Sequence, residues 1–176
     1  MLSGQKEKFQ SGFQITHNMQ LINKNIFDGE WHGMVHCANL YHTFGAGIAK
    51  QIKIKYPEAY KADCESTHGD KLKLGFFTFS DEDENKTIYN LYGQIGIGND
   101  KNPLKRNCQY DFIHDGIWRI CEFILDSKDD KPYCLAIPYK MASDRAGGSW
   151  GIIEAILSDI EYRFSPHIEF HIYRLD

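Results

Sequence analysis

The sequence predicts an α/β protein, a three-layer α/β/α sandwich on a mixed, largely parallel central sheet. Short runs of apolar and β-branched residues alternate along the chain with longer segments whose apolar residues recur at helical spacing. One pair of strand-like runs is joined by a short charged segment, which is typical of an antiparallel hairpin. Strands that alternate with helices, together with a single hairpin, predict this layered architecture.

The chain of 176 residues is long enough for one well-packed domain and short for two. Residues 1–12 are polar and contain glycine, so we expect a flexible N-terminal arm there. The rest of the chain shows no internal repeat and no composition shift that would mark a linker. A single domain is therefore expected over residues 13–176.

The first half of the chain predicts two strands and two helices. Alternating apolar positions indicate a strand over 19–23, and an apolar run indicates a second strand over 34–37. A polar, glycine-containing loop follows, and an amphipathic helix begins near Ile48. Pro57 ends that helix and is also allowed in the first turn of a second one, over about 57–66.

A hairpin and a long loop are expected next. Residues 72–80 and 87–93 are rich in aromatic and β-branched residues, and the charged segment Asp81 to Lys86 between them predicts an exposed tip. That acidic run is interpreted as a solvated loop rather than a metal site. Gln94 to Arg106 has no periodicity and contains several loop formers and cations, so we expect a long surface loop, of the kind that is often functional.

The second half repeats the alternation of helix and strand. Apolar residues at helical spacing predict a helix over 110–125, and a nearly continuous apolar run predicts a buried strand over 132–139. A glycine-bearing loop, Met141 to Ser149, leads into a helix over 150–164. Residues 168–175 close the chain as a strand.

Composition and charge narrow the class of protein. The chain is 42% hydrophobic and 25% charged, which is ordinary for a soluble globular domain. Its formal net charge of -4 argues against a general nucleic-acid coat. No run of apolar residues is long enough to span a bilayer, so no membrane partner is expected. The five cysteines form no CxxC pair, which predicts reduced thiols in a cytoplasmic, reducing compartment.

Two glycine loops, Asn39 to Gly47 and Met141 to Ser149, each follow a predicted strand and precede a helix. Ligands of open α/β sheets bind beyond the carboxyl ends of the strands, where unpaired helix amides attract phosphate. Neither loop matches a standard phosphate motif, because Lys50 stands where GxGxxG needs its third glycine and no GKS or GKT is present. Each loop alone also fits an ordinary tight turn; the pair favours a diphosphate held from two sides.

The segments HCANLYHTFGAGIAKQIKIKYP and IPYKMASDRAGGSW resemble the macro domain family of ADP-ribose binders. The similarity runs from about Met19 to the C-terminus and is greatest to the small ADP-ribose-1''-phosphate phosphatases and the related ADP-ribosyl hydrolases. This resemblance implies the macro domain fold. It also implies ADP-ribose or ADP-ribose-1''-phosphate as the ligand, with no cofactor.

The resemblance assigns substrate-binding roles around the first loop. Asn25 matches a position that holds the adenine amino group, and Asn39 matches an asparagine that faces the distal ribose. Asn39 also fits an Asx turn that closes the strand. Phe44 either packs on a ribose or fills the core. The first diphosphate loop corresponds to Gly45, Ala46, Gly47 and Ile48, whose amides would meet the phosphates.

The second loop departs from the family pattern, because Ala142 and Asp144 stand where glycines are usual. Asp144 is therefore either a catalytic base or nucleophile or a loop-capping residue. Arg145 either clamps a phosphate or lies in solvent. The remaining residues that the resemblance assigns to phosphate binding are Ser143, Ala146, Gly147 and Gly148.

His36 matches a strand-end histidine of the phosphatases and is a third candidate catalytic residue beside Asp144 and Asn39, although a buried structural histidine is the alternative. The hydrolase branch carries a covalent lysine after the hairpin, and Gln94 and its neighbours offer none. His167 and His171 lie on one face of the last predicted strand without a visible third ligand, so no metal site is expected.

The sequence therefore predicts an enzyme that binds ADP-ribose derivatives and hydrolyses ADP-ribose-1''-phosphate to ADP-ribose and phosphate. One alternative is a hydrolase that removes ADP-ribose from a modified protein or nucleic acid, guided by the basic segment Lys101 to Arg106. A second alternative is a binding module without turnover.

Overall fold

The computed structural model describes residues 19–83, 85–98, 106–127 and 132–175. The expected N-terminal arm and most of the basic segment, residues 101–105, lie outside these ranges.

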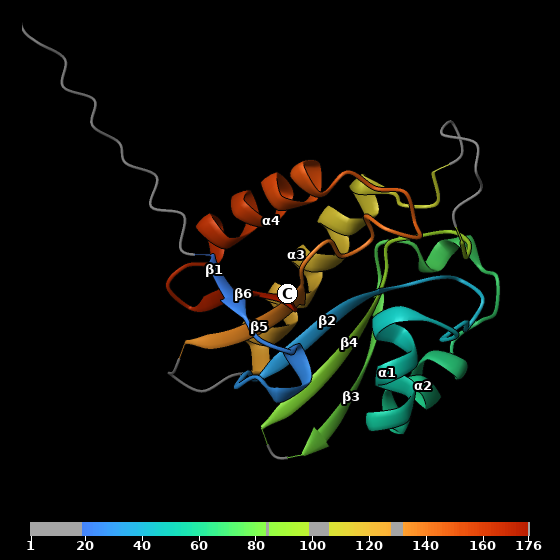
Figure 1. Cartoon of the computed structure of the whole chain (residues 1–176), viewed down its shortest axis with the longest axis horizontal. Helices are drawn as coiled ribbons and strands as arrows, with labels where there is room; N and C mark the ends of the chain where they lie inside the picture. The colour runs from blue at the N-terminus through green and yellow to red at the C-terminus, as the bar shows by residue number, and fades with distance from the viewer. Residues whose placement is uncertain (1–18, 84, 99–105, 128–131, 176) are drawn as a thin grey trace, which may run out of the picture.

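Figure 1 shows a central sheet with helices on both faces. The strands are β1 (Gln20–Asn23), β2 (Gly33–Ala38), β3 (Phe77–Asp83), β4 (Lys86–Tyr92), β5 (Tyr133–Pro138) and β6 (Ile168–Arg174). The α-helices are α1 (Gly47–Lys55), α2 (Pro57–Cys64), α3 (Tyr110–Ser127) and α4 (Trp150–Phe164), and the 3-10 turns are η1 (Ile26–Asp28) and η2 (Lys71–Lys73).

The sheet has the strand order β1-β6-β5-β2-β4-β3, and all of its pairs are parallel except β3 with β4. This confirms the expected mixed, largely parallel sheet. Parallel order places the carboxyl ends of β2 and β5 side by side at one edge of the sheet. The two loops that follow these strands therefore begin next to each other.

The two faces of the sheet bury separate cores because successive strand residues point to opposite sides. In β2, Val35 packs with the apolar faces of α3 and α4, whereas Met34 packs with Ile52 of α1 and Ala59 of α2. Helix α3 buries six residues at helical spacing, as its sequence predicts. No described helix is both long and apolar enough to cross a membrane.

The hairpin is confirmed, but its first strand begins later and ends later than expected. The side chain of Asp70 accepts a hydrogen bond from the Leu72 amide and starts η2, and Gly75 turns the chain with a φ of 75°. Strand β3 can therefore begin only at Phe77. At its other end it continues to Asp83, because Asp81 pairs with Thr87 across the strands before a bulge. The predicted charged loop is mostly strand.

Two helical glycines provide a matched test of packing on the sheet. A Cβ built on Gly116 of α3 would overlap Leu91 Cδ1 of β4, whereas nothing lies within 4 Å of a Cβ built on Gly151 of α4. In Gly116→Ala we expect overpacking to cost about 2 kcal/mol and helix propensity to return up to about 1 kcal/mol, so the free energy of unfolding should fall by about 1 kcal/mol. Gly151→Ala should raise it by up to about 1 kcal/mol through helix propensity. Urea unfolding of both variants checks this; equal effects would contradict the described contact between α3 and β4.

Candidate functional site

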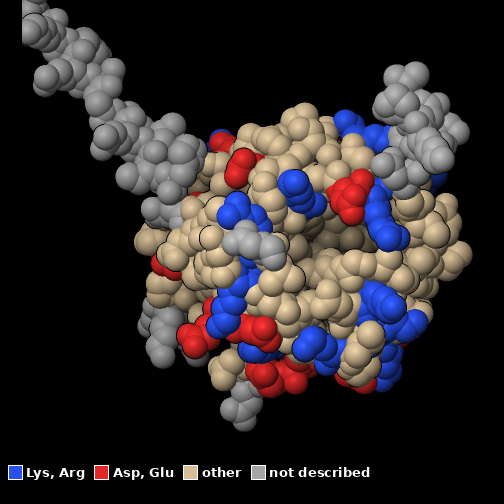
Figure 2. Space-filling view, viewed as in Figure 1, with Lys and Arg blue, Asp and Glu red and all other residues tan. Residues whose placement is uncertain are grey.

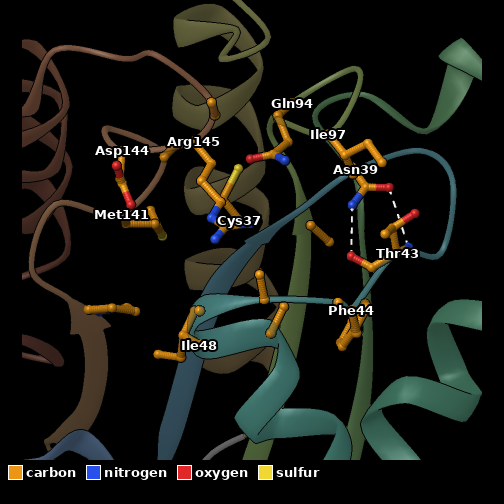
Figure 3. Close-up of a pocket in the computed structure, with 18 of the residues that line it drawn as sticks. Cys37, Asn39, Thr43, Phe44, Ile48, Gln94, Ile97, Met141, Asp144 and Arg145 are labelled. Carbon is orange, nitrogen blue, oxygen red and sulfur yellow. Dashed lines mark hydrogen bonds between the residues drawn. The ribbon is translucent and has the colours of Figure 1, made fainter. Parts of the chain in front are cut away.

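The two glycine loops line one cavity of about 550 Å³ at the carboxyl ends of β2 and β5 (Figure 3). A cavity of this size suits a nucleotide-sized ligand. Its lining comprises residues 37–39, 43–49, 94, 97–98, 138–142 and 144–146. The predicted convergence of the two loops is therefore present in the structure.

The first loop borders the cavity with main-chain amides that have no hydrogen-bond partner in the described part of the chain. Helix α1 begins at Gly47, whose φ of 56° favours glycine, and its N-cap residue Ala46 makes no side-chain capping bond. The first helical hydrogen bond runs from the Lys50 amide to the Ala46 carbonyl. The amides of residues 47–49 precede that bond, and these residues line the cavity. The helix dipole adds partial positive charge at the same place.

Asn39 shapes this loop and also lines the cavity. Its Nδ2 donates to the Thr43 carbonyl at 3.0 Å, and its Oδ1 accepts from the Tyr41 amide at 2.8 Å. Figure 3 shows Asn39 and Thr43 facing each other across the turn. The Asx turn foreseen as an alternative is present, while the residue keeps a place on the cavity wall. Phe44 packs its ring on Tyr60 in the core, as the alternative foresaw, and it also borders the cavity; its contact with a ribose stays a prediction.

The second loop is held by two unusual main-chain conformations. Lys140 and Ala142 adopt left-handed φ values of 59° and 57°, which L-residues seldom adopt. The Gly148 amide donates to the Ala142 carbonyl, and a Cβ at Gly148 would lie only 2.6 Å from that oxygen. Gly148 is thus required for the fold of the loop.

Only part of the second loop reaches the cavity. Asp144, Arg145 and Ala146 line it as predicted, whereas Ser143, Gly147 and Gly148 do not. Gly147 is exposed with a φ of 72°, and its amide donates to the Asp144 carbonyl, so it shapes the turn that presents Asp144. Phosphate binding by Ser143, Gly147 and Gly148 stays a prediction.

The charged residues of the cavity lining favour an anion. They are Lys140, Asp144 and Arg145, two cations and one carboxylate. In Figure 3 the side chains of Asp144 and Arg145 both extend from the second loop, on the wall opposite Asn39. Figure 2 shows acidic and basic side chains interspersed over this face, so the attraction is local to the cavity.

His36 is not brought to the cavity. It lies on β2 with no solvent exposure and packs its ring edge-on against Phe44. The Asn90 amide nitrogen donates to the Ala59 carbonyl, so Asn90 Oδ1 faces the imidazole and accepts from His36 Nε2 at 2.7 Å. His36 Nδ1 is buried, and no described residue forms a hydrogen bond with it. The histidine is the structural one foreseen as the alternative, and the structure gives it no path for proton transfer to a ligand.

Burial of His36 predicts acid sensitivity. A proton on Nδ1 would be buried without an acceptor, and burial lowers the pKa of His36 to about 4. The unfolded chain therefore binds this proton more readily than the folded one, and stability falls as the pH falls from about 6.5 toward 4. Between about pH 7.5 and pH 5 we expect a loss of about 2 kcal/mol from this group. Urea unfolding at both pH values checks this loss. If His36→Gln lost as much stability between the two pH values as the unchanged protein, His36 would not be its cause.

Asn25 lies away from the cavity wall. It follows β1, at the edge of the sheet, and its Oδ1 accepts from the Phe27 amide as the N-cap of η1. The cavity lining does not include it. The side-chain oxygen of Asn25 caps a helical turn, and its contact with adenine stays a prediction.

Sequence reasoning missed several lining residues. Gln94 and Ile97 belong to the loop after β4, which was expected to be functional without a named residue. Tyr139 and Lys140 directly follow β5, and their position at a strand end was the available signal. Cys37 also borders the cavity, but burial raises the pKa of its thiol far above the usual value, so it is not a nucleophile there.

No family model matches the sequence. The chain is 29% identical over 132 residues to an uncharacterized 17.5 kDa protein from the tk-vs intergenic region of Enterobacteria phage T4, over 73% of this chain and 79% of that protein. Its structure is similar to the macrodomain of Mycobacterium tuberculosis DarG, with a TM-score of 0.70 and 18% identity over 90% of this chain and 98% of that one. It is also similar to Thermosipho africanus DarTG, solved in complex with ADP-ribose, with a TM-score of 0.69 and 14% identity over 90% of this chain and 42% of that one. The chain thus has the macrodomain fold.

Proposed function

We propose that the cavity between the two loops binds ADP-ribose derivatives. The observation that carries this proposal is the placement of two loops from neighbouring parallel strands around one cavity, with uncapped amides of α1 on one wall. Lys140 and Arg145 add positive charge where a diphosphate would lie. The similarity in fold to DarTG, which was solved with ADP-ribose, supports the same ligand.

The reaction that we propose is hydrolysis of ADP-ribose-1''-phosphate to ADP-ribose and phosphate. Asp144 is the sole carboxylate among the described lining residues, so it is the candidate general base. It would take a proton from the water that attacks the terminal phosphorus. The bond from phosphorus to the ribose oxygen would break, and that oxygen would leave as a hydroxyl with the proton that Asp144 took. Arg145 would hold the phosphate oxygens, and the α1 amides would fix the diphosphate so that little reorganisation is needed.

A binding module without turnover is the second candidate. It is favoured by the position of His36, which is buried off the cavity and leaves Asp144 without a histidine partner there. In this case the same contacts would hold ADP-ribose or its derivative, and the bound molecule would be released without chemical change.

Calorimetric titration with ADP-ribose, followed by product analysis, tests both candidates. We expect ADP-ribose binding in the micromolar range, about -8 kcal/mol, and much weaker binding of ribose-5-phosphate as the control ligand. Phosphate release from ADP-ribose-1''-phosphate supports the enzyme, and its absence with retained binding supports the module. The same assay with ADP-ribosylated protein and DNA identifies a larger substrate. Failure to bind ADP-ribose at millimolar concentration would contradict the proposed function.

A further inference from the structure

A second polar cluster lies beside the first loop but outside the cavity. His42 comes from that loop, Asp63 and Cys64 come from the last turn of α2, and Lys73 comes from η2. His42 Nε2 lies 3.1 Å from Ser66 Oγ and 3.4 Å from Lys73 Nζ. None of these residues lines the cavity described above. The cluster therefore needs an explanation of its own.

We propose that His42, Asp63 and Cys64 bind one zinc-type divalent cation. Their donor atoms, one nitrogen, one oxygen and one sulfur, all lie within 4.8 Å of one another. Among the residues that the structure describes, no other group of three such donors is this close. Sequence spacing gave no sign of it, because His42 is far in sequence from the Asp63-Cys64 pair.

An unsatisfied carboxylate oxygen supports this site independently. Asp63 has no solvent exposure, and Tyr92 donates its hydroxyl to Oδ1 at 2.8 Å. The other oxygen, Oδ2, is buried and has no hydrogen-bond partner among the residues that the structure describes. Leaving such an acceptor unpaired costs about 1–3 kcal/mol. A bound cation would satisfy Oδ2 and compensate the burial of its charge.

The donor set selects zinc over magnesium or calcium. Hard cations take oxygen ligands, whereas an imidazole and a thiolate together favour zinc. Donors in a tetrahedral zinc site lie about 3.5 Å apart, so these three atoms must approach by roughly 1 Å. Cys64 is exposed and His42 half-buried, so neither is locked by packing. Three protein ligands leave the fourth position for water.

The positive charge of Lys73 should weaken cation binding at this site, and removing that charge tests the proposal. Its Nζ donates to Ser66 Oγ at 2.9 Å and to the Leu40 carbonyl at 3.3 Å, which fixes a positive charge beside the proposed site. Lys73→Met keeps the buried stem and removes the charge. We expect zinc affinity to rise more than about tenfold in this variant, because like charges this close repel strongly at protein dielectric. An unchanged affinity would place the cation elsewhere.

The experiment uses the untagged full chain, stripped of metal and titrated with Co²⁺ and then with Zn²⁺. We expect one equivalent of Co²⁺ to produce a thiolate-to-cobalt charge-transfer band that Zn²⁺ abolishes, and zinc to raise the melting temperature. Cys64→Ser should remove the band, and His42→Gln should weaken binding at least about tenfold. The control is His68→Gln, whose ring contacts His42 at 5.2 Å but lies outside the donor group; it should bind as the unchanged protein does.

Two results would overturn the proposal: no saturable Co²⁺ binding at micromolar metal, or a charge-transfer band that survives Cys64→Ser. Cys64 is exposed, so this variant is expected to fold, and far-ultraviolet circular dichroism confirms that it does. The titration requires no ADP-ribose. Its failure would therefore leave the proposed function of the cavity untouched.

Discussion

Asp144→Asn is expected to slow phosphate release from ADP-ribose-1''-phosphate by about 10²–10⁴-fold, the usual contribution of a positioned general base. The dissociation constant for ADP-ribose should change by less than about threefold, because ADP-ribose lacks the phosphate that the base acts beside. Asp144 is the sole carboxylate among the described lining residues, and His36 is buried off the cavity. Phosphate release and calorimetry measure the two quantities separately.

The substitution should leave the fold intact. The loop is held through the Asp144 main chain, whose carbonyl accepts from the Gly147 amide, and the side chain itself is exposed. Asp126→Asn, at an exposed carboxylate near the end of α3, serves as the control and should not alter the rate. A wild-type rate in Asp144→Asn would remove the carboxylate from the reaction. Loss of ADP-ribose binding together with the rate would make it a binding residue instead.

The architecture was predictable because the signals for it are local. Helical spacing in α3 and α4, the apolar run of β5 and the aromatic run of β4 each predict one element, and the connection rules then leave few ways to assemble them. The start of β3 was missed because it depends on Asp70 capping η2 and on the turn at Gly75. Each of these depends on one side chain or one φ angle, which the spacing of apolar residues along the sequence does not reveal.

The site was predictable in outline and not in its individual side chains. The loops could be placed at one edge because parallel strands align their carboxyl ends. Whether a residue faces the cavity or the core is decided by its partners: Asn90 fixes His36 inward, and the Phe27 amide engages Asn25. Ala142 illustrates the same limit, because the resemblance leads one to expect glycine there. Its left-handed φ of 57° is a conformation that glycine adopts more readily than alanine, and the sequence alone did not reveal it.

Gly45 is the position where binding can be blocked without disturbing the fold. It lines the cavity, and a Cβ built on it would meet only Thr43 Cγ2, at 3.9 Å, within 4 Å. Gly47 is a less suitable position, because its φ of 56° would strain any side chain placed there. A loss of binding in such a variant could not be separated from a loss of stability. Because a diphosphate held by main-chain amides needs close approach to the loop, a branched side chain at Gly45 should exclude it.

We therefore expect Gly45→Val to raise the dissociation constant for ADP-ribose at least about 100-fold, which corresponds to about 2.7 kcal/mol. The free energy of unfolding should change by less than about 1 kcal/mol, because Gly45 is exposed and a Cβ there makes only an ordinary contact. Gly151→Val, the same substitution at an open position of α4 that does not line this cavity, is the matched control and should bind ADP-ribose normally. Calorimetry gives the affinity and urea unfolding gives the stability. Undiminished binding in Gly45→Val would mean that the phosphates lie away from the first loop, and the ligand would then have to be held by the Lys140 to Ala146 wall alone.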